Sequence, residues 1–346
     1  MHVIVSHGSV LRLLRRGGRL APANPADVPA APSERPPRGE TAAAIRRARA
    51  ALEKARLLDA HHVLDVLVRP GDTRPHQPLV REHQWTSPTD PPLRRLVLPL
   101  DEGAPAIYVV APELLFVQAA SRLTLERTVL LGWELCGRYG KVMKGDVREE
   151  LVAQGFEKRD PLTRVERLQG FLGSMPNGLY GSKRAREALT YVRDGARSPM
   201  EAAVAFLLCA PPELGGFGLP APLVNHSVPL SPRAAALTLE ASLELDLYWE
   251  DPPLDVEVDG HAWHGGSKSK KQAARDAVRN NELERQKIPR IHLAGEELTN
   301  WRRFKLNALN IAAELQVVPQ IEDPAWEQRY RDLHAVAMNL VRPAVA

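Results

Sequence analysis

The sequence predicts an α/β protein, in which a mostly helical α+β region precedes a segment of paired strands. Apolar residues recur at helical spacing in several stretches, and the first of these is residues 41–60. Apolar and polar residues alternate at 243–248 and again at 256–259, which is the pattern of half-buried strands. Hydrophobic residues make up 44% of the chain and charged residues 25%, as in ordinary globular domains.

The composition divides the chain into four regions. Residues 1–40 are rich in Pro, Ala, Gly and Arg without sustained periodicity, and we expect a disordered or loosely packed arm there. Residues 41–195 are expected to form an α+β accessory or recognition domain. The paired strands fall within a domain expected at 196–315, and residues 316–346 are expected to add a C-terminal packing helix.

The periodicity predicts elements along both halves of the chain. A Pro-Glu pair is favourable in the first helical turn, so a helix is expected to begin at Pro112 and to run to residue 139. Strands are expected at 61–69, 93–100 and 106–110. Further helices are expected at 41–60, 148–154, 163–175, 183–193, 270–286, 300–315 and 326–340.

The sequence argues against a membrane protein and against a secreted one. Its longest candidate apolar run, residues 106–116, falls well short of the ~20 residues needed to span a bilayer. Cys136 and Cys209 each lie in an apolar, helix-like run and are expected to be buried free thiols, which fits a reducing cytoplasm. We therefore expect a cytoplasmic location and no membrane partner. A signal peptide is not expected, because basic residues interrupt the N-terminal apolar stretch at Arg12, Arg15, Arg16 and Arg19.

Three carboxylates are expected to converge on the two alternating runs. Glu257 and Asp259 share one face of the second run, and the turn signal of residues 251–253 would bring Asp246 of the first run alongside them. Clustered carboxylates repel each other unless a cation neutralises them, and oxygen ligands suit Mg²⁺ or Mn²⁺. The alternative is a solvated strand face whose carboxylates point to water.

Two histidines and a glutamate stand on either side of this pattern. His261 and His264 follow the second run directly, with Trp263 between them. An imidazole titrates near pH ~6.5 and can abstract a proton at neutral pH, although packing over the sheet edge would also explain these residues. Upstream, Ser198 is placed to cap a helix in which Glu201 would complete a capping box.

The segment after the strands is basic. Residues 261–305 contain eleven Lys or Arg against five Asp or Glu. Asp276 and Arg279 are spaced to pair on the surface of the expected helix. A solvated helix face is the ordinary explanation, but basic residues beside a carboxylate cluster are also what a phosphate-cleaving site requires. The candidate nucleic-acid contacts are Lys268, Lys270, Lys271, Arg275 and Arg279.

Residues 195–305 resemble the very-short-patch-repair-endonuclease-like (Vsr-like) branch of the PD-(D/E)XK nuclease superfamily. The matching residues are a helix glutamate, Asp246 on a strand, the segment Glu257-Val-Asp-Gly260, a following histidine and the helix pattern Asp276, Arg279, Leu283. The resemblance implies an αβββαβ restriction-endonuclease-like core. It also implies Mg²⁺ held by Asp246 and Glu257, and hydrolysis of DNA phosphodiester bonds by a metal-bound water, in bacterial repair or defence.

The chain departs from the superfamily pattern at one position. Asp259 stands where the pattern has a lysine, two residues after the acidic ligand. The repair-endonuclease branch also lacks this lysine and uses histidine, so the resemblance gives the role of base to His264, with His261 second. It places Glu201 as a helix carboxylate that faces the metal through water. Asp259 is our own candidate for a third ligand, direct or through water.

A more distant resemblance covers residues 60–195. The stretch VVAPELLFVQAASRL and the later LGWELCGRYG are similar to the AbiEi antitoxin family of abortive-infection systems, which implies a recognition module. A helical domain that only packs on the nuclease core is the alternative. Two further functions therefore stand beside a DNA endonuclease: a catalytically inactive, nuclease-fold DNA-binding regulator or antitoxin-like protein, and an RNA-directed nuclease.

Overall fold

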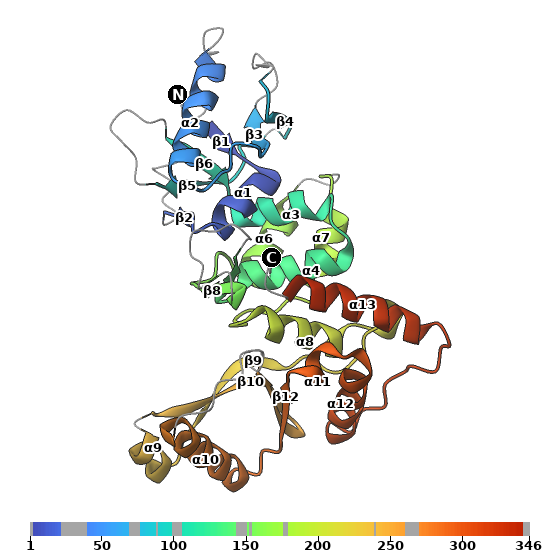
Figure 1. The fold of residues 1–346 in the computed structure, drawn as a ribbon. Coiled ribbons are helices and arrows are strands. Elements are labelled where there is room, and N and C mark those ends of the chain that lie inside the picture. The colour runs from blue at the N-terminus through green and yellow to red at the C-terminus, as the bar shows by residue number, and fades with distance from the viewer. Residues whose placement is uncertain are drawn as a thin grey trace.

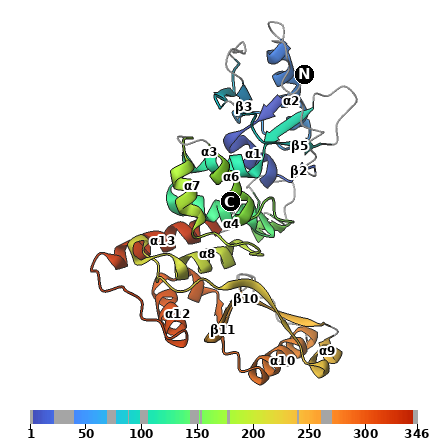
Figure 2. The ribbon, with the colours of Figure 1, turned by 180° about the vertical axis from the view of Figure 1, so that it is seen from behind.

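The computed structural model shows a mixed α/β protein, as the sequence predicted (Figures 1 and 2). A mixed sheet lies at the N-terminal end, helices occupy the middle, and a second sheet lies at the other end. The residues that the structure describes are 3–21, 40–68, 77–87, 89–98, 106–142, 151, 154–175, 179–238, 240–259 and 270–341. Among them, no helix combines the length and the apolar character that crossing a bilayer requires.

The N-terminal sheet has six strands in the order β2-β5-β6-β1-β3-β4. Its central strand β1 runs parallel to β6 and antiparallel to β3. Two helices, α1 (His7–Arg15) and α2 (Glu40–Lys54), contribute buried side chains to the same core. The strands are β1 (Val3–Val5), β2 (Arg19–Leu20), β3 (Leu64–Val68), β4 (Val80–Gln84), β5 (Leu93–Val97) and β6 (Ile107–Val110).

The expectation of a loose arm at residues 1–40 is wrong for the first half of this range. Residues 3–20 form β1, α1 and β2, and Val5, Val10 and Leu13 are fully or almost fully buried. Val10, Leu13 and Leu14 have helical spacing, but a three-residue strand and a nine-residue helix are too short to stand out beside the Pro- and Ala-rich stretch that follows. The remainder of the expected arm, residues 22–39, lies outside the described residues.

The middle of the chain is helical, with one small hairpin. The helix expected at 112–139 is divided into α3 (Pro112–Ala120) and α4 (Leu125–Cys136), because Thr124 caps the start of α4 by accepting from the Arg127 N–H at 3.5 Å. The helix expected at 148–154 lies mostly outside the described residues. The hairpin and the other helices are β7 (Tyr139–Lys141), β8 (Phe156–Lys158), α6 (Val165–Ser174) and α7 (Ser182–Leu189).

The C-terminal part is built around a four-stranded sheet in the order β12-β11-β10-β9. β9, β10 and β11 are antiparallel neighbours, whereas β12 pairs in parallel with β11 after a helical crossover. The hairpin predicted across residues 251–253 is confirmed. The elements are α8 (Pro199–Cys209), η2 (Pro212–Leu214), β9 (Leu223–Pro229), α9 (Pro232–Thr238), β10 (Ser242–Glu250), β11 (Pro253–Asp259), α10 (Lys270–Arg285), β12 (Arg290–Ala294), α11 (Glu296–Thr299), α12 (Trp301–Glu314) and α13 (Trp326–Val341).

One continuous cluster of buried side chains extends from β1 to α13. Its central element is α8, which is apolar on nearly every side and lies between α13 and the four-stranded sheet in both views (Figures 1 and 2). Trp326 of α13 stacks on Tyr330 at 5.1 Å between ring centres, and its indole N–H donates to the Gly216 carbonyl at 2.9 Å. The C-terminal helix is therefore part of the main core.

A second, smaller cluster attaches α10 to the sheet. Leu283 of α10 and Ile288 pack with Leu243 and Leu245 of β10 and with Val228 of β9. Helix α10 crosses over between the parallel strands β11 and β12, so this contact fixes its position on the sheet. It places Arg279 of α10 next to the carboxylates of the hairpin.

Candidate functional site

Asp246 lies where the hairpin stops pairing. The register of β10 and β11 runs from Glu250 opposite Pro253 to Leu247 opposite Val256, one residue short of Asp246. Beyond that point the Asp246 Oδ2 accepts a hydrogen bond from the Val258 N–H at 2.9 Å. The carboxylate therefore replaces a backbone partner between the two strands, and its position is fixed by the fold.

The surroundings of Asp246 disfavour the negative charge of its carboxylate. Burial, followed by the charges of Glu201 and Glu257, raises the pKa of Asp246 to about 7, although the Val258 N–H and the Arg279 charge oppose the shift. Three carboxyl groups from α8, β10 and β11 are thus close enough to interact. Near neutral pH about half of the Asp246 side chains carry a proton, and a bound cation would favour the ionised form.

Glu257 is already paired with arginines. The Arg279 Nη2 donates to the Glu257 Oε2 at 2.7 Å and to the Glu244 carbonyl at 2.6 Å. The Arg290 Nη2 lies 3.5 Å from the same Glu257 oxygen, while its Nε donates to the buried Asp255 at 2.6 Å. Arg279, expected on sequence grounds to contact nucleic acid, therefore makes its described contacts inside the site.

Asp259 occupies the last position of β11. Val256 and Val258 are buried while Glu257 and Asp259 are half-buried, which confirms the predicted alternation along this strand. The His292 Nε2 lies 3.9 Å from the Asp259 Oδ2. Asp259 thus shares a strand face with Glu257 and has a histidine of β12 beside it.

Glu201 has both a capping and an electrostatic role on α8. The Ser198 hydroxyl accepts from the Glu201 N–H at 3.1 Å, which confirms the predicted N-cap. The Glu201 Oε2 accepts from the Arg197 N–H at 2.8 Å and from the Asn225 amide at 2.7 Å. Burial raises the pKa of Glu201, which is only 6% exposed, and its charge raises that of Asp246. Ser198 therefore caps the helix as predicted, whereas the Glu201 carboxylate accepts from Arg197, one residue before the cap, instead of closing a reciprocal capping box on Ser198.

We expect Ser198→Ala to lower the free energy of unfolding by about 1 kcal/mol, because the helix loses its N-terminal cap. Urea denaturation of the full chain measures this difference. Ser174→Ala is the matched control: the Ser174 hydroxyl is exposed and donates to the Phe171 carbonyl of its own helix, so a change within about 0.5 kcal/mol is expected. Equal losses for the two variants would mean that Ser198 has no capping role.

Two supporting residues were missed by the sequence analysis. Asn225 of β9 has a positive φ of 49° and donates to both Glu201 and the Gly195 carbonyl. Arg197 makes a two-pronged ion pair with Glu244, next to Asp246 on β10. Asparagine tolerates the left-handed region, but this residue lies in a seven-residue strand whose sequence gives no sign of a turn. The arginine partner is 47 residues from Glu244, beyond any local pattern.

Several of the predicted site residues lie outside the part of the chain that the structure describes. His261, His264 and Lys268 lie outside the described residues, and the side chains of Lys270, Lys271 and Arg275 on α10 are likewise not described. Among the described residues, no group of three or more His, Cys, Asp or Glu side chains is arranged to hold a metal ion. Asp246 and Glu257 remain as the two candidate ligands that the fold brings together with Glu201.

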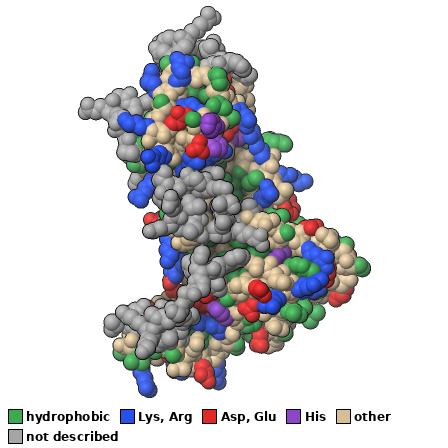
Figure 3. Space-filling model, in the orientation of Figure 1, with side chains coloured by type: hydrophobic (Ala, Val, Ile, Leu, Met, Phe, Trp, Pro, Cys, Tyr) green, Lys and Arg blue, Asp and Glu red, His purple; other side chains and the backbone are tan. Residues whose placement is uncertain are grey.

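Basic side chains are spread over the face of the protein that Figure 3 shows. On the face shown in Figure 3, Lys and Arg lie over both the N-terminal and the C-terminal parts, with Asp and Glu among them. The described side chains of this face therefore do not divide into one basic and one acidic surface.

Comparison of the chain with protein-family models, with curated proteins and with solved structures gives no match. The interpretation of the site therefore depends on its own residues and their geometry.

Proposed function

We propose that this protein is a metal-dependent endonuclease that hydrolyses DNA phosphodiester bonds, with Mg²⁺ or Mn²⁺ bound by Asp246 and Glu257. The observation that carries the proposal is the crowding of carboxylates at the end of the hairpin. Asp246 is held there by the Val258 N–H, and burial, followed by the charges of Glu201 and Glu257, raises its pKa to about 7. A divalent cation would relieve this repulsion, and carboxylate oxygens are its preferred ligands.

The order of the elements supports the proposal. Helix α8, strands β9 to β11, helix α10 and strand β12 follow one another as in the αβββαβ core of restriction-endonuclease-like folds, with α9 added between β9 and β10. In the Vsr-like branch this core carries its carboxylates on the two strands that correspond to β10 and β11. A shared order of elements bears on the fold alone, and the chemistry depends on the residues of the site.

The residues would divide the reaction among them. Asp246 and Glu257 would hold the cation, Asp259 would be a third ligand, direct or through water, and Glu201 of α8 would face it through water. A bound Mg²⁺ supplies a water of lowered pKa and offsets charge on the scissile phosphate. Arg279 donates to the Glu257 Oε2, so it would compete with the cation for the charge of this carboxylate, and a displaced guanidinium would be available to a phosphate oxygen.

His264 is proposed as the base that takes the proton of the attacking water, with His261 as the second candidate. Lys268, Lys270, Lys271 and Arg275 are proposed to contact the DNA backbone. Such contacts add affinity without sequence preference and weaken as salt is added.

A second candidate function is a catalytically inactive, nuclease-fold DNA-binding regulator or antitoxin-like protein. The Glu257 ion pair favours it: Arg279 at 2.7 Å and Arg290 at 3.5 Å already neutralise the carboxylate that the metal would need. In such a protein the arginines would take the place of the cation permanently.

Cleavage assays test the proposed function directly. Supercoiled plasmid, a short mismatched duplex and a single-stranded RNA are each incubated with the full chain and Mg²⁺ or Mn²⁺. The native protein should cut DNA, and Asp246→Asn should not. Glu250→Gln is the matched control, because Glu250 is exposed at the far end of the same strand and should leave cleavage unchanged. Binding of DNA without cleavage would favour the regulator, and cleavage of RNA alone would identify an RNA-directed nuclease.

We expect Arg279→Gln to increase the affinity for Mn²⁺ several-fold, because Glu257 would lose a competing cation worth about 1 kcal/mol. Isothermal titration calorimetry with MnCl₂ measures the change. Arg233→Gln on α9 is the matched control, since Arg233 is exposed and should not alter the affinity. No Mn²⁺ binding by any of the three proteins would contradict the metal site and support the inactive regulator.

A further inference from the structure

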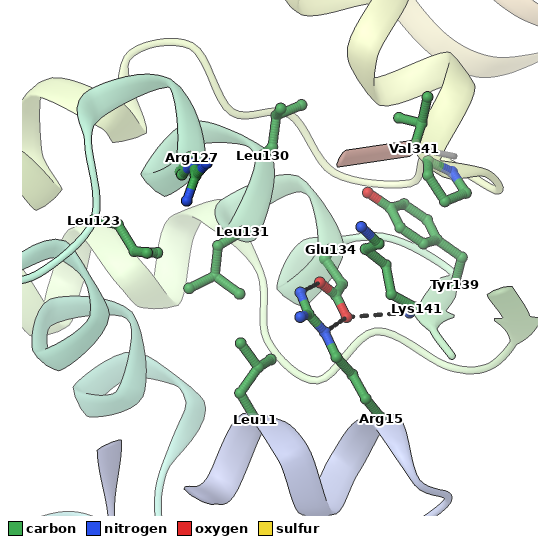
Figure 4. Close-up of a pocket in the computed structure, with 11 residues that line it drawn as sticks. Leu11, Arg15, Leu123, Arg127, Leu130, Leu131, Glu134, Tyr139, Lys141 and Val341 are labelled. Atoms are coloured by element: carbon green, nitrogen blue, oxygen red, sulfur yellow. Dashed lines mark hydrogen bonds and ion pairs between the residues drawn. The ribbon is translucent and has the colours of Figure 1, made fainter. Parts of the chain in front are cut away.

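The N-terminal part contains an ion pair whose carboxylate has its partners within the chain. Glu134 of α4 lies at the edge of a cavity of about 240 Å³ (Figure 4). Its side chain, 1% exposed, accepts from the Arg15 Nε at 3.0 Å and from the Lys141 backbone N–H at 3.1 Å. This contact joins the end of α1 to α4 and β7 and therefore stabilises the fold.

A pair of histidines lies at the other end of α1. His7, the first residue of this helix, has a positive φ of 52°, which residues other than glycine seldom adopt. Its ring stacks on that of His83 of β4, with 3.7 Å between the ring centres and 21° between the ring planes. The His7 N–H donates to the Gln118 side chain of α3 at 2.9 Å and thereby supports this conformation. Backbone held in this region is frequent at functional sites.

Each ring is oriented by a hydrogen bond at one of its nitrogens. The register of β3 and β4 sets Arg81 opposite Asp65, so that His83, two residues later, lies on the same face. The His83 Nε2 is 2.8 Å from the Asp65 Oδ1, and the His7 Nδ1 is 2.9 Å from the Ser6 hydroxyl. The two nitrogens of an imidazole diverge, so the second nitrogen of each ring points away from these partners. Within the described part of the chain neither second nitrogen is hydrogen-bonded or buried, and both are open to solvent.

The described charges around the two rings are mainly positive. Arg81 and Arg122 are both exposed, and the Arg81 Nη1 lies 3.8 Å from the Asp65 Oδ1. Burial, followed by the charges of His83 and Arg122, lowers the pKa of His7 to about 4. Asp65 opposes this shift, and Arg81 adds to it. The His7 ring is therefore neutral at pH 7, and a bound anion would offset the positive charge around it.

A metal ion fits this arrangement less well than an anion does. An imidazole binds a metal through a lone pair in its ring plane, and two stacked, nearly parallel planes cannot direct both lone pairs to one ion. Two parallel N–H groups instead suit two oxygens of one tetrahedral oxyanion, and guanidinium groups suit the oxygens of phosphate. The phosphate of a monoester offers three acceptor oxygens and about −1.5 to −2 charges at pH 7, which two arginines can balance.

Both rings can donate a hydrogen bond to such an anion. The Ser6 hydroxyl can donate to the His7 Nδ1, which leaves the proton of this neutral ring on Nε2. Although burial opposes the shift, hydrogen bonds from His83 and Ser9 lower the pKa of Asp65, so this carboxyl group is ionised. His83 therefore donates to Asp65 from Nε2 and needs a second proton to donate from Nδ1. Binding of the anion should thus take up about one proton.

We propose that His7 and His83, together with Arg81 and Arg122, bind a phosphate group, either that of a small phosphomonoester or inorganic phosphate itself. Its oxygens accept from the His7 Nε2 and the His83 Nδ1, and the two guanidinium groups balance its charge. The site is separate from the proposed nuclease and does not depend on it, because none of these residues belongs to the elements that carry the candidate carboxylates.

Isothermal titration calorimetry of the full chain at pH 7 and constant ionic strength compares four probes: inorganic phosphate, methyl phosphate, dimethyl phosphate and acetate. Inorganic phosphate or methyl phosphate should bind at least about tenfold more tightly than the other two, which carry a single charge and offer fewer acceptor oxygens. Tighter binding of methyl phosphate than of inorganic phosphate would identify a monoester as the ligand, and the reverse order would identify free phosphate. Equal binding of all four probes, or binding of none, would overturn the proposal.

Sulfate tests the proton that His83 has to gain, because sulfate remains a dianion at both pH 6 and pH 8. Its affinity should be several-fold higher at pH 6. At pH 7 the binding enthalpy should differ between buffers of different ionisation enthalpy, since a proton is taken up. Equal affinity at the two pH values without proton uptake would contradict a histidine site.

Variants of the two histidines locate the site. His83→Gln should weaken phosphate binding at least about tenfold, because the new amide can still donate to Asp65 but cannot take up a proton. His7→Asn should have a similar effect, and asparagine tolerates the positive φ of this position, so the turn into α1 is kept.

Arg122→Gln supplies an independent variant at an exposed side chain, and it should weaken phosphate binding several-fold. His62→Gln is the matched control and should leave the affinity unchanged. His62 also pairs with an aspartate, with its Nδ1 3.0 Å from the Asp59 Oδ2, but it lies outside the stacked pair. Unchanged phosphate affinity in His83→Gln, His7→Asn and Arg122→Gln would show that phosphate binds elsewhere and would overturn the proposal.

Discussion

Asp246→Asn is expected to abolish metal-dependent DNA cleavage and, at the same time, to make the protein more stable at pH 8. Under the proposed function the variant loses a direct ligand, and the rate should fall by roughly a thousandfold or more. The gain in stability has a separate origin. The Asp246 carboxylate is destabilised by burial and then by the charges of Glu201 and Glu257. An amide of the same shape carries no charge, and its oxygen can still accept from the Val258 N–H.

The sign of this effect follows from proton binding. The pKa of Asp246 is about 7 in the folded protein and ~3.9 in an unfolded chain. Between these values the folded state holds more protons, so the free energy of unfolding of the native protein falls as the pH rises from about 4 to 7. The Asp246→Asn variant has no carboxyl group at this position, so its free energy of unfolding does not fall for this reason. We therefore expect its advantage to be near zero at pH 4.5 and on the order of 2–4 kcal/mol at pH 8.

Urea denaturation in the presence of EDTA at the two pH values measures the difference, with Glu250→Gln as the control that should show no pH-dependent change. Addition of Mn²⁺ at pH 8 should stabilise the native protein and leave the variant unchanged. If Asp246→Asn lost the same stability at both pH values, the Asp246 carboxylate would not be destabilised by burial and neighbouring charges, even if cleavage were abolished.

Glu134→Gln is expected to lower the free energy of unfolding at pH 7 by about 3–5 kcal/mol, the usual range for breaking a buried ion pair. Glu134 is 1% exposed, and the variant would leave the Arg15 guanidinium without its two-pronged partner. Because the Arg15 side chain is itself 23% exposed, water can recover part of the loss, and the lower end of the range is expected.

This loss should also depend on pH. The pKa of Glu134 is about 2 in the folded protein, below its unfolded value of ~4.3. The carboxylate therefore contributes stability above pH ~4.3, and the contribution disappears as the pH falls towards 2. Guanidinium chloride denaturation at pH 7 and pH 3 should show a smaller difference between variant and native protein at pH 3. Glu53→Gln, which breaks a half-exposed pair with Arg49, should cost less than about 1 kcal/mol.

The elements around the candidate site were largely predictable, because their signals are local. The alternation in β10 and β11, the Pro-rich turn and the Ser198 cap are all set by residues within a few positions of one another. The same holds for the helical spacing of α12 and α13. For these elements propensity and packing favour the same structure, so a single sequence is sufficient.

The parts that were not predicted depend on distant residues. β4 reads Val-Arg-Glu-His-Gln, a mostly polar stretch that becomes a strand only because β3 pairs with it. The burial of β1 and α1 likewise requires β6 and α3. Within the site, the partners of Glu257 and Glu244 come from 22 and 47 residues away. Only the tertiary structure shows that Arg279 is directed towards a carboxylate.

The continuous core has a consequence for how this protein can be divided. Helix α8 carries Glu201 and is buried along almost its whole length, with α13 and α4 on one side and the strands of the site on the other. A fragment cut at residues 196–315 would keep the carboxylates but expose that helix to water. The segment with the candidate catalytic residues is therefore not expected to fold on its own. Gene fusions or domain exchanges that contain it should fail unless they include the N-terminal helices and the C-terminal helix as well.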